Sequence, residues 1–140
     1  MLNSEFPTPV IKLKPWGREI WFAWTKKYAG KILEVKKNAR LSLQLHKRKT
    51  ETQYVLSGRV NLTFGPSAKN LKTKILKPGM IFHIKPQVIH RLKGLAPHSQ
   101  ILEVSTPELN DVIKLADDYG RTGQGNNEKL DHSLATKNFK

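Results

Sequence analysis

The stretch LSLQLHKRKTETQYVLSG, residues 41–58, decides the fold. Apolar and polar residues alternate in its first and last parts, which is typical of β-strands, and basic residues separate the two parts. The same pattern continues from Ile32 to Ile101, where short apolar runs are divided by turn residues such as Asn38 and Gly58. Many short strands in succession favour an all-β fold that closes into a barrel or double sheet.

The alternation assigns residues 31–107 to the barrel. Apolar residues between Leu109 and Leu115 recur at helical spacing, which predicts a short C-terminal helix over residues 108–121. Residues 122–140 show little periodicity and predict a flexible tail. Residues 1–30 predict an N-terminal arm that packs on the barrel. The predicted strands run near residues 31–36, 41–46, 52–57, 59–64, 72–76, 80–84, 90–93 and 99–106.

The composition limits the possible functions. The chain has 140 residues, which suits one domain, and its 25 Lys and Arg against 11 Asp and Glu give a net charge of +14. This charge favours anions, namely phosphate esters, nucleic acid or acidic membrane. The chain has no cysteine, which excludes disulfides and thiolate metal sites and fits a reducing, cytoplasmic compartment. Prolines and charges interrupt the first thirty residues, so we expect neither a signal peptide nor membrane attachment.

Four residues could form a metal site. Alternation along a strand places Gln44 and His46 on one face, Glu51 opens the next strand, and His90 begins a later one. An amide oxygen, two imidazoles and a carboxylate suit one divalent transition metal, with Zn²⁺ favoured and Mn²⁺, Fe²⁺, Co²⁺ or Ni²⁺ as alternatives. The competing interpretation is that these are surface residues of lysine-rich strands.

The spacing of these residues resembles the two cupin motifs. A block at residues 41–46, LSLQLH, and another at residues 117–121, DDYGR, make the chain similar to the type II mannose-6-phosphate isomerase family over roughly residues 12–121. That domain also forms the C-terminal part of bifunctional mannose-1-phosphate guanylyltransferases. The motif reads Gln44-x-His46-x4-Glu51-x6-Gly58, followed by His90.

The resemblance implies a cupin fold, a double-stranded β-helix or jelly-roll barrel. It implies that Gln44, His46, Glu51 and His90 hold the metal. The family reaction interconverts mannose 6-phosphate and fructose 6-phosphate through an enediol, in which the metal polarises oxygens and a base moves a proton. The expected partners are therefore a phosphorylated sugar and, as in many cupins of this size, a second copy of the chain.

Basic residues at family positions are candidates for the substrate site. Lys31, Lys49 and Arg121 are predicted to bind the substrate, and Lys49 and His83 are predicted to be catalytic. For the lysines the alternative is a solvated basic surface. Arg121 could instead belong to a helix cap that ends at Gly120, and His83 could be a bystander.

The chain departs from the family beside Glu51. Lys49 replaces an arginine, and a lysine cannot make the same bidentate contact with an anion. Thr52 and Gln53 stand where the family has His-Trp. These departures keep a second hypothesis open, a diverged metal-binding cupin that acts on or binds another sugar derivative without isomerase activity.

The basic charge and the aromatic residues leave further alternatives. A basic interaction protein that has lost its metal would also carry many lysines, but the chain has no RNA-binding motif and its aromatic residues do not interleave with the lysines. We therefore expect no specific nucleic-acid partner. An aromatic cluster suggests packing of the N-terminal arm, a dimer interface or sugar stacking. Its members are Trp16, Trp21, Phe22 and Trp24.

Overall fold

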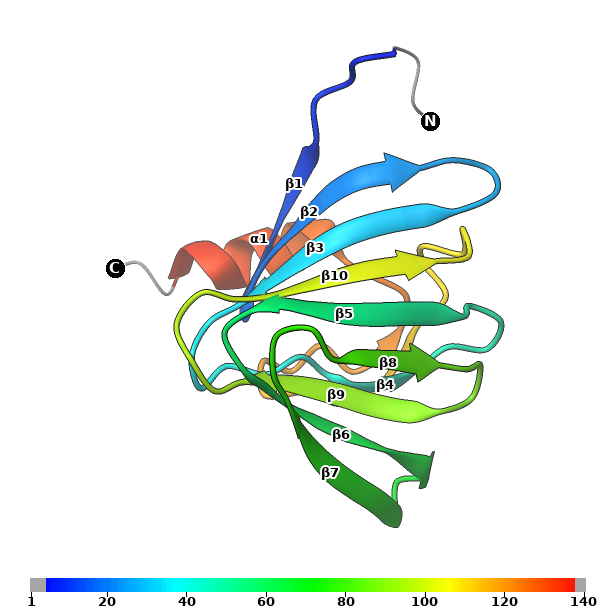
Figure 1. The fold of residues 1–140 in the computed structure, drawn as a ribbon, viewed down its shortest axis with the longest axis vertical. Helices are drawn as coiled ribbons and strands as arrows, with labels where there is room; N and C mark the ends of the chain where they lie inside the picture. Colours follow the sequence, from blue (N-terminus) through cyan, green and yellow to red (C-terminus); the bar gives the residue numbers. More distant parts are fainter. Residues whose placement is uncertain (1–4, 138–140) are drawn as a thin grey trace.

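The computed structural model describes residues 5–137 and consists of two six-stranded antiparallel sheets and one helix (Figure 1). The first sheet has the strand order β1-β2-β3-β10-β5-β8, which Figure 1 shows from top to bottom. Its strands are β1 (Val10–Lys14), β2 (Gly17–Trp24), β3 (Ala29–Val35), β10 (Ser99–Ser105), β5 (Glu51–Ser57) and β8 (Ile81–Ile84).

The second sheet has the order β12-β11-β4-β9-β6-β7 and packs against the first. Its strands are β12 (Gly123–Gln124), β11 (Ile113–Ala116), β4 (Leu43–Leu45), β9 (Ile89–Gly94), β6 (Val60–Ser67) and β7 (Asn70–Leu76). The predicted all-β double sheet is therefore confirmed, and every predicted strand of residues 31–106 has a counterpart.

The core lies between the two sheets and follows from the alternation of apolar residues. In β3, for example, Leu33 and Val35 are buried whereas Ile32 and Glu34 are only partly buried. The buried apolar cluster contains Trp16, Leu33, Val35, Leu41, Val55, Val60, Leu62, Leu76, Leu92 and Ile101. This packing fixes which side chains of each strand point into the barrel.

Two predicted turns have the left-handed backbone that their residues favour. Asn38 has φ 69° and Gly58 has φ 74°. A Cβ atom at Gly58 would lie 2.6 Å from the Cα atom of Ser99, so no other residue fits there without a shift of the backbone. Gly58 thus allows β5 to turn directly into β6.

The segment predicted as an N-terminal arm contributes two strands to the first sheet. β1 pairs with β2, and β2 pairs with β3, where Ile20 lies opposite Ile32. Trp16 is buried in the core. The first sheet is therefore wider than the barrel of residues 31–107 alone.

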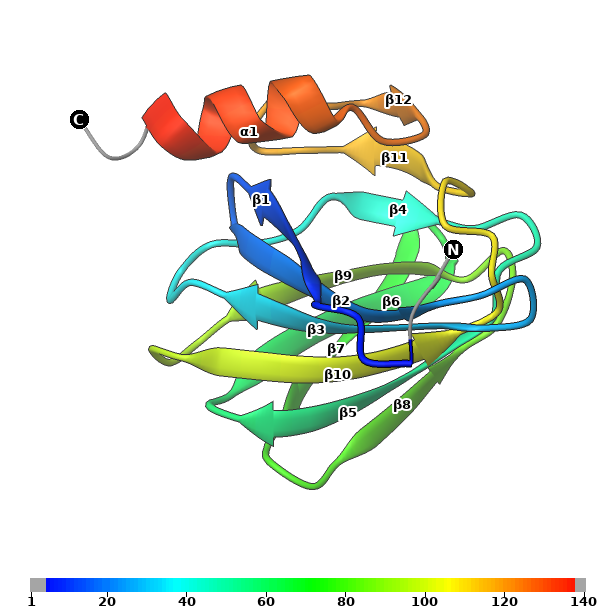
Figure 2. The ribbon, with the colours of Figure 1, turned by 90° about the horizontal axis from the view of Figure 1, so that it is seen from above.

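The predicted positions of the helix and the tail were wrong. Residues 108–121 form turns and β11, because Ile113, Lys114 and Ala116 pair with β4 in the second sheet. The short C-terminal helix exists, but it is α1 (Glu128–Lys137), inside the predicted tail, and it packs against β1 (Figure 2). Residues 138–140 of the predicted tail lie outside the described residues.

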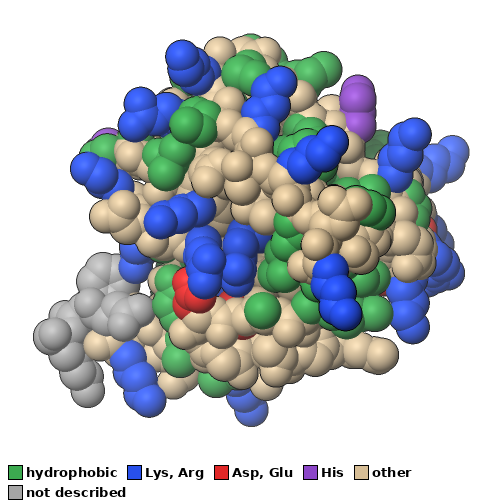
Figure 3. Space-filling view, turned by 90° about the horizontal axis from the view of Figure 1, so that it is seen from below, with side chains coloured by type: hydrophobic (Ala, Val, Ile, Leu, Met, Phe, Trp, Pro, Cys, Tyr) green, Lys and Arg blue, Asp and Glu red, His purple; other side chains and the backbone are tan. Residues whose placement is uncertain are grey.

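The chain carries a net charge of +14. Lys and Arg side chains are spread over the face shown in Figure 3 and do not gather in one patch. Within residues 5–137, no helix is long and apolar enough to cross a membrane.

Candidate metal centre

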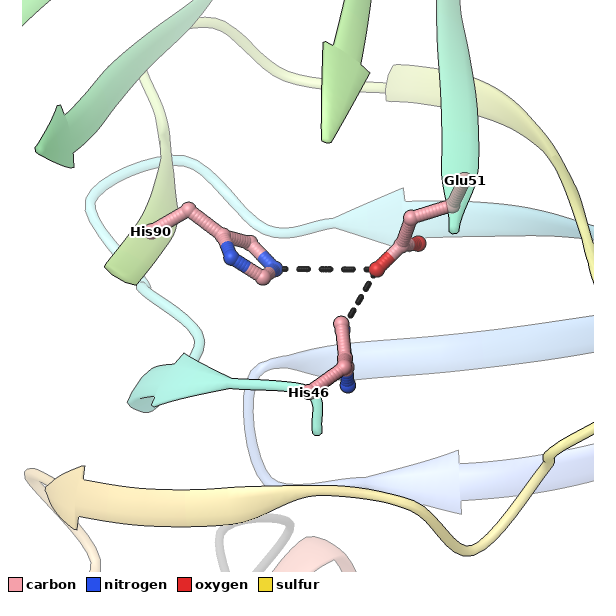
Figure 4. Close-up of side chains that lie close together, drawn as sticks. All are labelled: His46, Glu51 and His90. Carbon is pink, nitrogen blue, oxygen red and sulfur yellow. Dashed lines mark ion pairs between the residues drawn. The ribbon is translucent and has the colours of Figure 1, made fainter. Parts of the chain in front are cut away.

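Three side chains converge inside the barrel (Figure 4). His46 directly follows β4 and His90 lies on β9, both in the second sheet, whereas Glu51 begins β5 in the first. Oε1 of Glu51 lies 2.5 Å from Nε2 of His46 and 3.6 Å from Nε2 of His90. Each residue is only 2% exposed. The cluster therefore joins the two sheets across the barrel interior.

The backbone fixes the orientation of both imidazoles. Nδ1 of His46 lies 2.6 Å from the carbonyl oxygen of Asp111, and Nδ1 of His90 lies 3.0 Å from that of Val88. A carbonyl oxygen only accepts hydrogen bonds, so each Nδ1 carries the hydrogen and each Nε2 presents its lone pair to Glu51. Burial lowers the pKa of His46, which keeps its ring neutral.

This arrangement leaves acceptors facing acceptors. Nε2 of His46 and Nε2 of His90 have no hydrogen-bond partner among the described residues. One ligand atom from each of the three residues lies within 4.8 Å of the others. Buried hydrogen-bond acceptors that face one another without a donor are unfavourable unless a cation lies among them. Imidazole nitrogens and carboxylate oxygens are typical ligands of transition metals, and such imidazoles commonly donate their other N–H to a backbone carbonyl. The residues present therefore fit a divalent metal.

Gln44 reaches the same place but has another contact as well. It lies opposite His90 in the pairing of β4 with β9, and it lines the small cavity beside Glu51. Its Oε1 accepts a hydrogen bond of 2.9 Å from the hydroxyl of Ser42. Gln44 remains the predicted fourth ligand.

The cavity at the cluster is small and lined mainly by polar residues. Its volume of about 40 Å³ holds a metal ion and one or two waters. Lys31 and Lys49, both predicted to bind the substrate, lie in its wall and are buried. The complete lining is Glu19, Lys31, Leu33, Leu41, Gln44, Lys49, Glu51, Gln53, His90, Arg91, Leu92 and Glu103.

Lys31 is held by two carboxylates that sequence analysis did not assign. Its Nζ lies 3.3 Å from Oε1 of Glu19 and 3.8 Å from Oε2 of Glu103. Burial acts to lower the pKa of Lys31, but these charges outweigh it and raise the pKa. Burial acts to raise the pKa of Glu19, but Lys31 and Lys14 bring it down to about 2. The wall of the cavity thus contains fixed, compensated charges.

Glu103 is a buried carboxyl group that sequence analysis missed. Burial and the charge of Glu51 raise the pKa of Glu103 to about 8, so it carries a proton at neutral pH. Its Oε1 accepts a hydrogen bond of 3.0 Å from Nε2 of Gln53, and its protonated carboxyl group shares a hydrogen bond with Glu51. An acidic residue at an inward position of the apolar strand β10 was the available indication.

Two predicted site residues lie elsewhere. His83 is exposed on the outer side of the first sheet, 2.9 Å from the hydroxyl of Thr52, because Glu51 pairs with Ile84 and the neighbouring pair points outward. The structure therefore places His83 outside the cluster formed by His46, Glu51 and His90. Arg121 is buried, but it does not line the cavity.

Arg121 instead joins the second sheet to α1. Its guanidinium donates to Oδ1 of Asp117 at 2.8 Å and to Oδ1 of Asp131 at 3.1 Å. The structure therefore places Arg121 in an ion-pair network with two carboxylates, away from the cavity beside Glu51. The alternative of a helix cap at Gly120 is not observed, because residues 118–120 form a turn after β11 and no helix ends there.

The chain has sequence relatives that are much longer. Residues 5–117 match the family described as mannose-6-phosphate isomerase C-terminal. The chain is 31% identical over 114 residues to the xanthan biosynthesis protein XanB of Xanthomonas campestris pv. campestris, a match that covers 78% of this chain and 23% of XanB. It is 32% identical over 116 residues to the alginate biosynthesis protein AlgA of Pseudomonas aeruginosa, a match that covers 79% of this chain and 23% of AlgA. The chain thus spans less than a quarter of these relatives.

Solved structures with low sequence identity share the fold. KdgF from Halomonas sp. matches with TM-score 0.61 and 18% identity, covering 76% of this chain and 91% of KdgF. Oxalate decarboxylase from Bacillus subtilis, which contains Mn(II) centres, matches with TM-score 0.67 and 16% identity. The match covers 76% of this chain and 30% of the decarboxylase. CapF from Staphylococcus aureus matches with TM-score 0.67 and 14% identity, and the match covers 81% of this chain and 33% of CapF. The predicted cupin fold is confirmed.

Proposed function

The chain belongs to the mannose-6-phosphate isomerase C-terminal family, and from this premise we propose that it is a metal-dependent isomerase that interconverts mannose 6-phosphate and fructose 6-phosphate. The observation that carries the proposal is the buried set of facing acceptors made by His46, Glu51 and His90. A family member that retains this set retains the means to hold the metal. The expected compartment is the cytoplasm, in keeping with the cysteine-free composition.

His46, Glu51 and His90 would hold the metal, with Gln44 as the fourth ligand. We favour Zn²⁺, and Mn²⁺, Fe²⁺, Co²⁺ or Ni²⁺ would suit the same nitrogen and oxygen atoms. A bound divalent ion supplies Lewis-acid polarisation of sugar oxygens. Asp111 and Val88 keep the two imidazoles in the tautomer that this task requires.

Glu103 is our candidate for the proton-transfer group in place of His83. An aldose–ketose shift moves a proton between neighbouring carbons, so it needs a group that gives and takes a proton near neutral pH. Glu103 lines the cavity beside Glu51, and its burial raises its pKa from the ordinary value toward the neutral range. Lys49, whose charge lowers the pKa of Glu51, supplies positive charge beside the developing enediolate.

The size of the cavity limits how the substrate binds. A space of about 40 Å³ takes only the reacting end of a sugar, after bound water leaves. The phosphate then stays outside the cavity, where the basic surface attracts it. In this arrangement Lys31, compensated by the ionised Glu19, orients the sugar hydroxyls and does not bind the phosphate.

A second candidate is a cupin that acts on or binds another sugar derivative without isomerase activity. Two departures from the family, Lys49 and Gln53, lie in the cavity wall, and Gln53 donates a hydrogen bond to Glu103. Its Oε1 is buried without a hydrogen-bond partner among the described residues, so it can accept a hydrogen bond from a ligand hydroxyl. Residues in contact with substrate determine selectivity, and these two differ from the family.

One experiment separates the two candidates. The metal content of the purified chain is measured, and the conversion of mannose 6-phosphate is followed by NMR for the native chain, His46→Ala and the matched control His83→Ala. If the chain is the isomerase, the native chain should contain stoichiometric metal and convert mannose 6-phosphate. His46→Ala should abolish this turnover, and the control His83→Ala should keep it. Metal without turnover favours the second candidate. Absence of metal after reloading rules out both.

A further inference from the structure

The helix α1 is attached to the barrel mainly through one buried carboxylate. The buried residues of α1 are Asp131 and Ala135, so little apolar surface holds the helix in place. Asp131 is 2% exposed, and its carboxylate lies 2.8 Å from Nζ of Lys14 and 3.1 Å from the guanidinium of Arg121. The position of α1 therefore depends on an anion held by cations of the barrel.

Three buried cations surround Asp131. Lys14 and Arg121 contact it directly, and Lys114 interacts with it electrostatically from β11. Arg121 also donates to both carboxylate oxygens of Asp117, at 2.9 and 2.8 Å. Burial lowers the pKa of Lys114, and the charge of Arg121 lowers it further. We call Lys14, Lys114 and Arg121 the α1 seat, and its positive charges exceed those of the two carboxylates that face it.

Two hollows flank Asp131. One has a volume of about 510 Å³, lies between α1 and the segment before it, and is lined by Lys114 and Arg121. The other has a volume of about 270 Å³, lies between α1 and β1, and is lined by Lys14. Asp131 lies in the wall of both hollows. An anion can therefore approach the cations that Asp131 now contacts.

The α1 seat adjoins the metal cavity. Lys114 lies opposite Gln44 in the pairing of β11 with β4, so both residues belong to the inner face of the second sheet. Lys14 interacts electrostatically with Glu19, which lines the cavity and is itself paired with Lys31 at 3.3 Å. One layer of side chains thus separates the cations under α1 from the proposed reaction site.

The segment that leads to α1 is suited to movement. Gly120 and Gly123 have φ of 76° and 116°, and a Cβ atom at either position would meet no other residue within 4 Å. Glycines in open positions of this kind can absorb the backbone rotation of a hinge. The match to the family ends at residue 117, so α1 and this segment lie outside the matched residues.

We propose that the α1 seat is a binding site for a phosphate monoester, and that the carboxylate of Asp131 occupies this site until the phosphate displaces α1. A phosphate monoester carries a charge of about −1.5 to −2 at neutral pH, so the three cations attract it more strongly than they attract a carboxylate. The guanidinium of Arg121 keeps one N–H for this anion while it remains bound to Asp117.

The identification of the monoester as a sugar phosphate rests on the proposed function. The reacting end of the sugar would lie in the metal cavity, and its phosphate would lie under α1, beyond Gln44 and Glu19. The α1 seat itself requires neither metal nor turnover to bind phosphate. The two proposals can therefore fail separately.

Calorimetric titration of the full chain with inorganic phosphate, at constant ionic strength, tests the site. Asp131→Asn removes the charge that competes with phosphate, so this variant should bind phosphate at least about tenfold more tightly than the native chain. The matched control is Asp118→Asn, which changes the net charge equally at an exposed pair with Arg40 and should bind phosphate as the native chain does.

A second substitution locates the gain. Addition of Lys14→Met to Asp131→Asn should remove the tighter binding, while the unfolding temperature confirms an intact barrel. Equal phosphate affinities for Asp131→Asn and Asp118→Asn would overturn the proposal, because the gain would then come from net charge alone. A gain that survives Lys14→Met would overturn it as well.

Displacement of α1 is measured on the native chain. Phosphate should make trypsin cleave after Lys129 several times faster than chloride does at the same ionic strength, with a peptide substrate correcting for any effect on trypsin. Equal cleavage rates would overturn the displacement. With mannose 6-phosphate, Asp131→Asn should lower KM and change kcat little, and an unchanged KM would overturn the assignment to a sugar phosphate. A chain without turnover would refute the proposed function and leave the calorimetric result standing.

Discussion

The carbonyl oxygen of Asp111 lies 2.6 Å from Nδ1 of His46, so one residue of a loop fixes a metal ligand on another segment. The carboxylate of Asp111 accepts hydrogen bonds from the backbone N–H groups of Lys47, Arg48 and Lys49, at 3.0, 2.7 and 2.9 Å. Three consecutive donors around one carboxylate form an anion-binding nest. Asp111 therefore holds both His46 and the connection that leads to the next ligand.

We predict that Asp111→Ala weakens metal binding about 10- to 100-fold, because the connection that it anchors relaxes and the carbonyl leaves His46. Competition with a chelator measures the affinity. The control is Asp118→Ala, which removes an exposed carboxylate paired with Arg40 and should leave the affinity unchanged. Equal affinities for the native chain and Asp111→Ala would show that the loop does not position His46.

The second prediction concerns metal removal. Because His46 and His90 lie on one sheet and Glu51 on the other, a bound ion joins the two layers of the barrel. Metal at 100 times its dissociation constant should stabilise the fold by about 2.7 kcal/mol and raise the unfolding temperature by roughly 10 °C. Calorimetry with and without chelator measures the shift. Glu51→Gln should show little or no shift, and a shift of native size in that variant would exclude Glu51 as a ligand.

The sequence predicted the metal cluster well because strand alternation is a local rule. Alternation put Gln44 and His46 on one face of a strand, and the resemblance to the cupin motifs implied Glu51 and His90 as further ligands; His46, Glu51 and His90 lie together in the structure. The same rule could not place His83. Alternation shows which residues of a strand share a face, but it does not show which of the two faces points into the barrel. Only the pairing of Glu51 with Ile84 decides that His83 faces outward.

The C-terminal region was predicted less well because its structure depends on distant partners. The apolar spacing between Leu109 and Leu115 suited a helix, yet this segment pairs with β4 as β11. The true helix buries Asp131, not an apolar stripe, so hydrophobic periodicity could not reveal it. Its start was visible locally, since Asn127 caps the N–H of Leu130.

The third prediction is a loss of stability in acid that depends on Glu19. The pKa of Glu19 is about 2 in the folded chain against an ordinary value of 4.5, so its contribution is complete above about pH 4.5 and is lost as the pH falls toward 2. The difference corresponds to about 3 kcal/mol. Urea unfolding at several pH values should show a shallower dependence for Glu19→Gln. The exposed control Glu5→Gln should keep the native slope, and parallel curves for the native chain and Glu19→Gln would contradict the assignment.

The fourth prediction is that a buried ion pair holds α1. Oδ2 of Asp131 lies 2.8 Å from Nζ of Lys14, and its Oδ1 lies 3.1 Å from Arg121. Asp131→Ala leaves both cations without this buried partner and should cost about 3 kcal/mol.

Because the missing contacts all belong to α1, the helix should detach while the barrel keeps its metal. Trypsin should then cleave after Lys129 several times faster than in the native chain. The matched control is Glu128→Ala on the same helix, which removes an exposed ion pair with Lys12 of β1. This variant should cost less than about 1 kcal/mol and change the cleavage rate little. Equal cleavage rates for the two variants would mean that apolar contacts such as the buried Ala135, and not Asp131, secure the helix.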